Sequence, residues 1–548
     1  MDLFTYLMAK NGNNSSVHGD LFSYLLGKGQ SQTYTVSGTT IYIPNAKKLV
    51  NFMLTKESSQ HTTSGKNKID FTKTLATTNN VSYECNNTYQ MYINGTANAN
   101  ATIQCNNSVY LDSGSYVFQL SFESGSIDSS GINAGFILRN EDTDSNITTI
   151  NVNNNDNKYI EFTLTEPTNV KARMYVRTNM IFNNAVINLN VIPGNTPDYI
   201  FEEYTGGQPS PSPEFPQSVK TVKGYSNLFD KDNANILYGY INTNGNFYNY
   251  NITNRKYIYI SCLSNTTYTI SKITGKYFRV ASFNELPTTN NTASINSDTS
   301  HDTNDVITFN TGENANYLIV NYIHTNNDTL TEQEILNSIM IIEGDQELPY
   351  VPYGNNYIAV NISDGTNTNQ VPIPLNNNEI AGIGNYLDEY IIDKNGHCWL
   401  NKVMKKYIFT GNEDGWNLAE TNINTYRFTN DKILKDNQPS TYLNNLMCNF
   451  FQVYNGNFGI SDIDSEGIAL RNNLNGFTIR ALISRVTDLN GFKNYLQTQY
   501  NNGTPIIAYY GLATPELIDL QTTVDLKLFK GANTITNSED ANMTIEYR

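Results

Sequence analysis

The sequence predicts an all-β protein of tandem antiparallel β-sandwich modules, preceded by two short N-terminal helices. Stretches of alternating apolar and polar residues recur along most of the chain, and turn residues separate them about every ten positions. This spacing is typical of antiparallel sandwiches and argues against regularly alternating strands and helices. A separate observation, a helical phrase that occurs twice within residues 1–30, predicts the helices.

The repeated phrase suggests an anchor. Asp2 and Asp20 are suited to cap a helix, and a lysine followed closely by a glycine ends each copy. Helices of about nine or ten residues are marginal alone in water, so they need a surface to pack against. We expect residues 1–30 to dock the protein onto a larger assembly; packing on the chain's own first β-domain is the alternative. The expected anchor side chains are Leu3, Phe4, Tyr6, Leu7, Leu21, Phe22, Tyr24 and Leu25.

Two sandwich modules are predicted, at residues 65–204 (module one) and 225–354 (module two). Their openings, at 65–70 and 225–230, and their closings, at 191–195 and 341–345, are offset by about 150–160 residues, which indicates a domain duplication. Each module is long enough to bury its own core. The predicted strands are 115–124, 158–165 and 170–178 in module one, and 257–263, 267–273, 277–284, 305–311, 316–323 and 338–344 in module two.

The remaining segments flank these modules. Residues 31–64 are expected to form a connecting β segment, and residues 205–224 a linker whose closely spaced prolines favour an extended spacer. Residues 355–548 predict a third, less similar β-rich module, with strands at 405–410, 447–454, 477–484 and 505–511.

Two local signals stand out in this third region. Residues 390–400 predict a hairpin, with Asn395 and Gly396 suited to a type I′ turn. Residues 489–500 predict a helix capped by Asp488, with Phe492, Tyr495 and Leu496 on one face.

Composition and charge exclude several function classes. The 548 residues include 35 basic and 51 acidic side chains, for a net charge of −16, so nucleic acid and anionic membrane surfaces are not expected as partners. No signal-peptide pattern is present, and no apolar run approaches the roughly 18 residues of a membrane-spanning helix, so membrane insertion is not expected. The cysteines, Cys85, Cys105, Cys262, Cys398 and Cys448, are widely spaced and are expected to be reduced; a Cys85–Cys105 bridge is the alternative.

Four phrases together carry a resemblance to a known family. They are residues 2–7, the linker at 206–216, residues 227–230 and residues 509–515. In this order they resemble the tail-fibre, baseplate receptor-binding or minor tail structural proteins of phages that infect Gram-positive bacteria. The chain lacks the collagen-like repeats and long heptads of long fibres. A compact arrangement of beads is therefore expected in place of a slender rod.

The resemblance implies a location and a set of partners. It implies a place in the virion tail or baseplate and N-terminal attachment to other virion proteins there. It also implies jelly-roll-like modules that resemble carbohydrate-binding ones, a host cell-surface glycopolymer as ligand, and a homo-oligomer, commonly a trimer.

No pattern predicts catalysis, a cofactor or a metal, so we expect no enzyme activity. The motifs GxSxG, HExxH and Walker A are absent, and the five histidines are scattered. Carboxylate pairs such as Glu202–Glu203 or Asp142–Asp144 read as ordinary turn and surface acids. Asp462, Asp464 and Glu466 match the first half of an EF-hand loop, but position 12 is Asn473 and lacks the bidentate carboxylate, so we expect a solvated turn.

Sugar binding needs flat aromatic rings beside amides or carboxylates. In module two this pattern selects Tyr248, Tyr250, Tyr317, Asn321 and Tyr322, although tyrosine is also a common structural residue of strands. In module one, strand 170–178 should turn Lys171, Arg173 and Arg177 outward; they form a solvated face, or else a contact for an anionic glycopolymer. The sequence thus predicts a virion tail or baseplate protein that binds host carbohydrate. The alternatives are a purely architectural virion protein and a cell-wall glycan hydrolase.

Overall fold

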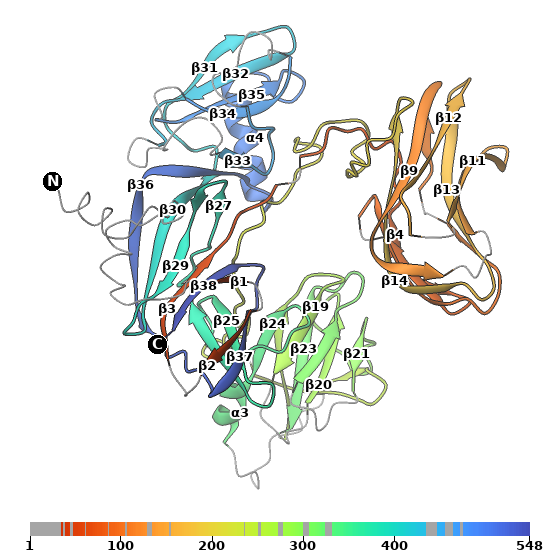
Figure 1. The fold of residues 1–548 in the computed structure, drawn as a ribbon. Coiled ribbons are helices and arrows are strands. Elements are labelled where there is room, and N and C mark those ends of the chain that lie inside the picture. Colours follow the sequence, from red (N-terminus) through yellow and green to blue (C-terminus); the bar gives the residue numbers. More distant parts are fainter. Residues whose placement is uncertain are drawn as a thin grey trace. The chain divides into compact units, whose positions relative to one another are not determined.

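A computed structural model confirms the all-β fold class (Figure 1). Antiparallel strands make up most of the described chain, which contains two helices, α3 (Glu332–Ser338) and α4 (Leu489–Asn501). The predicted helices and anchor side chains of residues 1–30 lie outside the described residues. These are 34–36, 39–43, 48–60, 62–85, 87–104, 107–128, 134–152, 155–234, 236–249, 254–271, 278–299, 306–323, 331–434, 446–454, 464–471 and 475–547.

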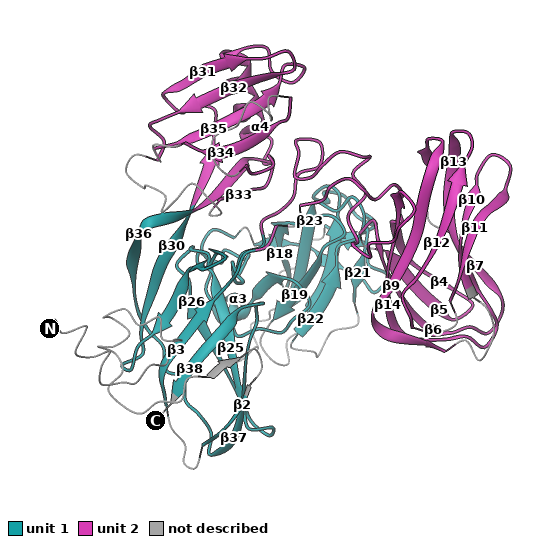
Figure 2. Ribbon diagram, turned by 45° about the horizontal axis from the view of Figure 1, so that its top comes forward, with its two compact units in different colours: residues 1–58, 220–405, 511–548 teal, residues 59–219, 406–510 magenta. Residues whose placement is uncertain are grey.

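The chain divides into two compact units (Figure 2). The first contains residues 1–58, 220–405 and 511–548, and the second contains residues 59–219 and 406–510. Module one belongs to the second unit and module two to the first, and each unit also takes part of the C-terminal region.

Module one is a sandwich of two sheets. One has the order β12 (Lys158–Leu164), β9 (Gly114–Asp128), β14 (Ile181–Pro193), β6 (Gln90–Thr96), β5 (Val81–Cys85) and β4 (Lys73–Thr78). The other has the order β11 (Ser145–Val152), β10 (Ala134–Asn140), β13 (Thr168–Val176) and β7 (Ala101–Gln104), and β8 (Val109–Leu111) also pairs with β13.

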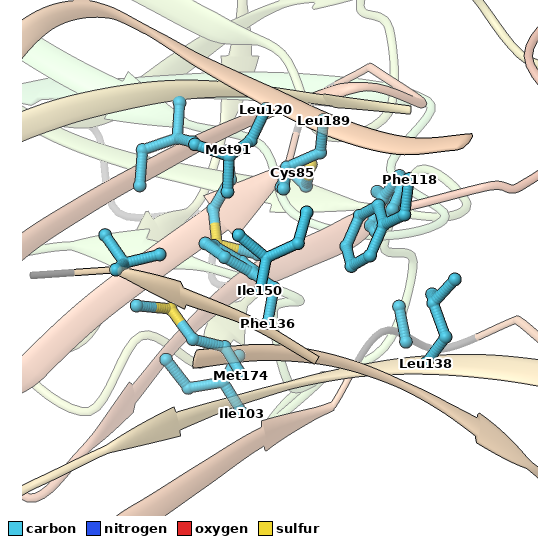
Figure 3. Close-up of a cluster of buried hydrophobic side chains, with 14 of the residues drawn as sticks. Cys85, Met91, Ile103, Phe118, Leu120, Phe136, Leu138, Ile150, Met174 and Leu189 are labelled. Carbon is cyan, nitrogen blue, oxygen red and sulfur yellow. The ribbon is translucent and has the colours of Figure 1, made fainter. Parts of the chain in front are cut away.

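Side chains from both sheets of module one fill the core between them. Figure 3 shows Phe118 and Leu120 of β9 above Phe136 and Leu138 of β10. The alternation predicted for residues 170–178 is confirmed, because its apolar positions are at most 1% exposed: Val170, Ala172, Met174 and Val176.

Module two is also built of two main sheets. One has the order β15 (Leu237–Tyr238), β18 (Arg255–Ser261), β23 (Tyr317–Ile323), β20 (Phe278–Phe283) and β21 (Ser297–Asp298). The other has the order β22 (Val306–Asn310), β19 (Thr267–Ser271) and β24 (Met340–Glu343). A small hairpin pairs β16 (Tyr240–Ile241) with β17 (Phe247–Tyr248), and α3 contributes Ile335 and Leu336 to the core.

The strand orders support the inferred duplication. In module one β9 pairs with β12 and β14, and in module two β19 pairs with β22 and β24. The facing sheets run β11-β10-β13-β7 and β21-β20-β23-β18. Each opening also carries a buried asparagine, Asn67 or Asn227, whose Oδ1 accepts the amide two residues later, at 3.1 and 3.0 Å.

Strands from both ends of the chain form a further sandwich, which belongs to the first unit except for its residues within 406–510. A four-stranded sheet has the order β2 (Thr39–Ile43), β37 (Gly531–Asn537), β25 (Tyr357–Ser363) and β26 (Thr368–Pro374). A seven-stranded sheet has the order β1 (Tyr34–Val36), β38 (Asn542–Tyr547), β3 (Leu49–Thr55), β29 (Glu389–Ile392), β30 (His397–Phe409), β36 (Ile506–Thr523) and β33 (Leu446–Cys448). Strands β1, β2 and β3, which lie in the connecting β segment expected at residues 31–64, therefore pair with C-terminal strands, and β27 (Gly382–Ile383) pairs with β28 (Tyr386–Leu387).

The second unit ends in a sheet with one helix. The sheet has the order β31 (Trp416–Thr421), β32 (Thr425–Asn430), β35 (Phe477–Leu482) and β34 (Gly467–Leu470). Helix α4 confirms the helix predicted at 489–500, and Asp488 caps it by accepting the Gly491 amide at 2.7 Å. Phe492 of α4 stacks on Phe428 of β32 with ring centroids 4.0 Å apart.

The predicted hairpin at 390–400 forms, but its type I′ turn is wrong. A type I′ turn needs positive φ at both central residues, here Asn395 and Gly396, and Asn395 does not have it. The Gly396 amide instead donates to the Asp393 carbonyl at 2.8 Å, and Gly396 has φ +82°. The Asp393 carboxylate accepts the amides of Asn395 and His397, which fixes a longer loop with glycine in the left-handed position.

Candidate functional site

The candidate site lies on the outer face of the β18–β23–β20 sheet of module two. One face of this sheet packs into the module core through Ile258 and Val320. The hairpin β16–β17 covers part of the other face, because Phe247 is fully buried there against Tyr257, with ring centroids 5.1 Å apart. Phe247 thus anchors the hairpin and fixes the position of the neighbouring Tyr248.

A cluster of aromatic and amide side chains stands on this hairpin. Tyr240 and Tyr248 are cross-strand partners, and their rings stack with centroids 5.3 Å apart and planes 14° apart. The Tyr248 hydroxyl and the Asn246 Nδ2 both donate to Asn291 Oδ1, at 2.8 and 2.9 Å. We call these four residues and Arg255, whose Cζ lies 4.5 Å from the Tyr240 ring centroid, the tyrosine–arginine cluster. Its rings and amides are held in place before any ligand binds.

The neighbouring cation differs from Arg255. Lys256 points to the other side of β18, and its Nζ contacts both carboxylate oxygens of Glu332, at 2.6 and 2.7 Å. Within the described ranges, no carboxylate forms an ion pair with Arg255. The cluster therefore carries one positive charge, on the guanidinium that lies over the Tyr240 ring.

The residues that the sequence predicts to bind sugar lie in different surroundings in the structure. Tyr248 belongs to the cluster, and Tyr317 is half-buried with its ring edge-on to Tyr259 at 6.2 Å. Asn321 is 1% exposed, and its Nδ2 donates to the carbonyls of Gly239 and Lys256. It therefore holds the hairpin against the sheet and does not face solvent.

Tyr322 is also internal. Its side chain is fully buried, and its hydroxyl donates to Glu332 Oε1 at 2.9 Å. Burial raises the pKa of this hydroxyl, and the nearby Glu332 charge adds to the rise. Tyr322 is thus a core residue, and Tyr250 lies outside the described residues.

Sequence reasoning missed Tyr240, Asn246, Arg255 and Asn291. A usable signal was the Asn244-Gly245 pair, which marks a turn and brings the segment of Tyr240 beside that of Tyr248. No local signal places Asn291 or Arg255 beside these rings, because both come from segments that are brought together by tertiary folding.

The carboxylate pair considered for glycosidase chemistry has structural contacts. The Glu202 carboxylate accepts the amides of Ser64 and Lys66, at 3.0 and 3.1 Å, and the Ser64 hydroxyl at 2.6 Å. The Glu203 carboxylate accepts the amide and hydroxyl of Thr88, at 3.0 and 2.6 Å. Both side chains therefore hold the module closing against other segments of module one.

The basic stripe of module one is largely neutralised. Lys171 pairs with Glu141 at 3.2 Å, and Arg173 pairs with Asp144 at 3.1 Å. Arg177 lies 5.9 Å from the ring centroid of Tyr175.

The calcium candidates do not converge in the described structure. Asp464 accepts a hydrogen bond from the Asn424 side-chain amide at 3.1 Å. Glu466 accepts the Leu482 backbone amide and pairs with Arg485 at 2.9 Å. Asp462 lies outside the described residues. Within the described ranges, no cluster of three or more histidine, cysteine or acidic side chains is arranged to hold a metal ion.

The cysteines of the described chain form no disulfide with one another. Cys85 is buried and donates to the Gln90 carbonyl at 2.8 Å, and Cys105 lies outside the described residues. Burial raises the pKa of Cys448 to about 11, so its thiol stays protonated at neutral pH. Among the described helices, neither is long and apolar enough to span a bilayer.

Two comparisons with known proteins give no match, and a third gives solved structures of low similarity. No protein-family model matches the chain, and no curated protein matches it. The solved structures that align include the tandem CBM51 modules of Sp3GH98, the family 98 glycoside hydrolase from Streptococcus pneumoniae SP3-BS71, at 8% identity over 56% of this chain and 98% of that one, with a TM-score of 0.15.

Two viral structures also align. The STIV MCP aligns at 10% identity over 43% of this chain and 95% of that one, with a TM-score of 0.11. The Macrobrachium rosenbergii nodavirus structure aligns at 8% identity over 60% of this chain and 92% of that one, with a TM-score of 0.13. At such low TM-scores, none of these likenesses supports an argument about fold or function.

Proposed function

We propose that this protein is a component of a phage tail or baseplate that binds host cell-surface carbohydrate through its β-sandwich modules. The single observation that supports binding is the tyrosine–arginine cluster of module two. The proposed place in a virion rests on the resemblance of residues 2–7, 206–216, 227–230 and 509–515 to phage tail proteins.

The cluster has the chemistry that a sugar site needs. The apolar C–H face of a sugar packs on a flat aromatic ring, and its hydroxyls pair with amides whose orientation is fixed. Tyr248 and Asn291 supply such a ring and amide, joined by a hydrogen bond of 2.8 Å. A single contact of this kind would be weak, and several copies in one particle would raise the avidity.

A retention experiment on the full chain tests carbohydrate binding. Purified wall polysaccharides from Gram-positive bacteria are immobilised, and retention of wild type is compared with that of Tyr248→Ala. We expect wild type to be retained on at least one polysaccharide and Tyr248→Ala to be retained at least tenfold less. Tyr110→Ala is the matched control, because Tyr110 is 68% exposed on module one and lies outside the cluster.

The other outcomes identify the alternatives. Equal retention of wild type and Tyr248→Ala would remove the cluster from the proposal. Absence of retention on every polysaccharide would favour a purely architectural virion protein, and release of reducing ends would favour a glycan hydrolase. Deleting residues 1–30 tests the attachment, because we expect the shortened protein to be missing from assembled particles.

A further inference from the structure

We infer that the glycan bound at the tyrosine–arginine cluster is acidic, and that Arg255 holds its carboxylate or phosphate group. This inference rests on the carbohydrate-binding role proposed above and names the ligand class of the same site. It follows from three features of Arg255: its position on an aromatic ring, its lack of a carboxylate partner in the described chain, and the uncharged hydrogen-bonding groups beside it.

The first feature is a guanidinium whose place is fixed without a negative charge. The Arg255 carbonyl accepts the Gly239 amide at 3.1 Å, which places Tyr240 beside the start of β18. Arg255 Cζ then lies 4.5 Å from the Tyr240 ring centroid, within the range of a cation–π contact. An arginine above a ring still has N–H donors at the edges of its guanidinium, and these match the two oxygens of a carboxylate or phosphate.

The second feature is a contrast with other arginines of the described structure. Six of them pair with carboxylates: Arg139, Arg173, Arg427, Arg471, Arg480 and Arg485. In a chain of net charge −16, a partly exposed guanidinium readily finds an acidic partner. Arg255 instead contacts an aromatic ring, and no carboxylate of the described ranges pairs with it.

The third feature is the neutral character of its neighbours. Glu332 neutralises Lys256 on the other side of β18, so it does not compete for an anion at Arg255. Asn291 Oδ1 already accepts two hydrogen bonds, so Asn246 and Asn291 offer side-chain N–H groups and Tyr248 offers a ring, which suit hydroxyls and C–H groups. One cation among such groups fits a sugar that bears one oxyanion, such as a uronic acid or a sugar phosphate.

The test compares three oligosaccharide probes by titration calorimetry on the full chain. They are an oligogalacturonate, which carries carboxylates, a glycerol phosphate oligomer, which carries phosphates, and the neutral maltoheptaose. We expect at least one acidic probe to bind tenfold or more tightly than the neutral probe. The better of the two acidic probes then identifies the source of the oxyanion.

Variants locate the effect. Arg255→Gln should lose the preference for the acidic probe, and Arg255→Lys should keep only part of it, because lysine has the charge without the planar fork. Arg471→Gln is the matched control, since it removes the same charge from a partly exposed arginine outside module two that already pairs with Asp431. Raising the salt concentration should weaken acidic binding by wild type and not by Arg255→Gln.

Each outcome decides between the two proposals. If the neutral probe binds as tightly as both acidic ones, or if Arg255→Gln binds the acidic probe like wild type, this inference is overturned. Loss of neutral binding in Tyr248→Ala would then leave the proposed function intact. If no probe binds wild type although wall polysaccharide retains it, this inference alone is overturned; if wall polysaccharide does not retain it either, both are overturned. Thermal melts of each variant confirm that it is folded.

Discussion

At the scale of single residues, one buried asparagine in each sandwich module joins the opening of that module to its closing. Asn227 Nδ2 donates to the carbonyls of Ile339 and Val351, at 3.3 Å each, and its Oδ1 accepts the amides of Phe229 and Ile341 at 3.0 Å. In module one Asn67 donates to the Glu202 carbonyl and accepts the Ile69 amide. One polar side chain thus satisfies backbone groups that come from both ends of a module.

Replacing Asn227 with alanine should therefore destabilise module two. The change leaves buried donors and acceptors without partners, and we expect a loss of about 3 kcal/mol. Hydrogen exchange in β24 would report it, with faster exchange in the variant. Asn146→Ala is a suitable control, because Asn146 is exposed on β11 and should change stability by less than about 0.5 kcal/mol. Equal exchange in β24 of both variants would contradict this role of Asn227.

A buried ion pair in the first unit gives a second prediction. Asp388 is fully buried, pairs with Lys402, and accepts the amides of Ala381, Val403 and Met404. Burial raises the pKa of Asp388, and Lys402 and the amides oppose that rise. Lys402→Met should cost about 3–5 kcal/mol, because it leaves the carboxylate without its counter-ion. The double variant with Asp388→Asn should recover part of the loss in chemical unfolding; no recovery would argue against the pair.

Glu420 makes stability depend on pH. Burial raises its pKa, but the nearby polar side chain of Asn422 and the positive charges of Arg427 and Arg480 outweigh that effect and lower it. The stabilisation is therefore present above the unfolded pKa of about 4.3 and is lost as the pH falls through the lower folded pKa. Glu420→Gln should speed hydrogen exchange in β32 and β35 at pH 7, and the difference from wild type should shrink below about pH 4. A difference that is constant with pH would contradict this.

At the scale of elements, the hairpin β16–β17 connects the fold to the candidate site. Its turn resembles the one at Gly396: the Gly245 amide donates to the Asn242 carbonyl at 3.1 Å, and Gly245 has φ +81°. A Cβ added to Gly245 would lie 2.1 Å from Ser297 Oγ. Space and backbone conformation both require glycine here.

Gly245→Ala should therefore weaken carbohydrate binding without unfolding the module. The displaced turn would shift Tyr248 from Asn291, and we expect retention on wall polysaccharide to fall at least fivefold. Gly503→Ala separates the two causes, because Gly503 also has positive φ, +76°, but its added Cβ meets no atom within 4 Å. That control should keep full retention, and equal losses in both variants would show that general strain is responsible.

At the scale of the whole molecule, local patterns predicted strands well and their surroundings poorly. Strand 170–178 was predicted with its buried face, because one side of β13 packs inward and the other does not. Asn321 and Tyr322 were mistaken for surface residues, because both faces of β23 are covered, one of them by the distant hairpin. The pairing of residues 34–55 with the C-terminal strands was missed for the same reason: alternation shows that a strand exists but not which strand it joins.

That long-range pairing has a consequence for the two units. β37 and β38 hold β2 and β3, so removing residues 531–548 takes partners from strands almost 500 positions earlier, as in the pairing of Thr40 with Thr534. We expect this deletion to speed hydrogen exchange in residues 39–55. Exchange in β9 and β14 should stay as in wild type, because the buried core residues of module one, within the described part of the chain, come from residues 69–191. If β9 and β14 lost protection as well, the stability of module one would depend on the C-terminal strands, and the two units would not be independent in folding.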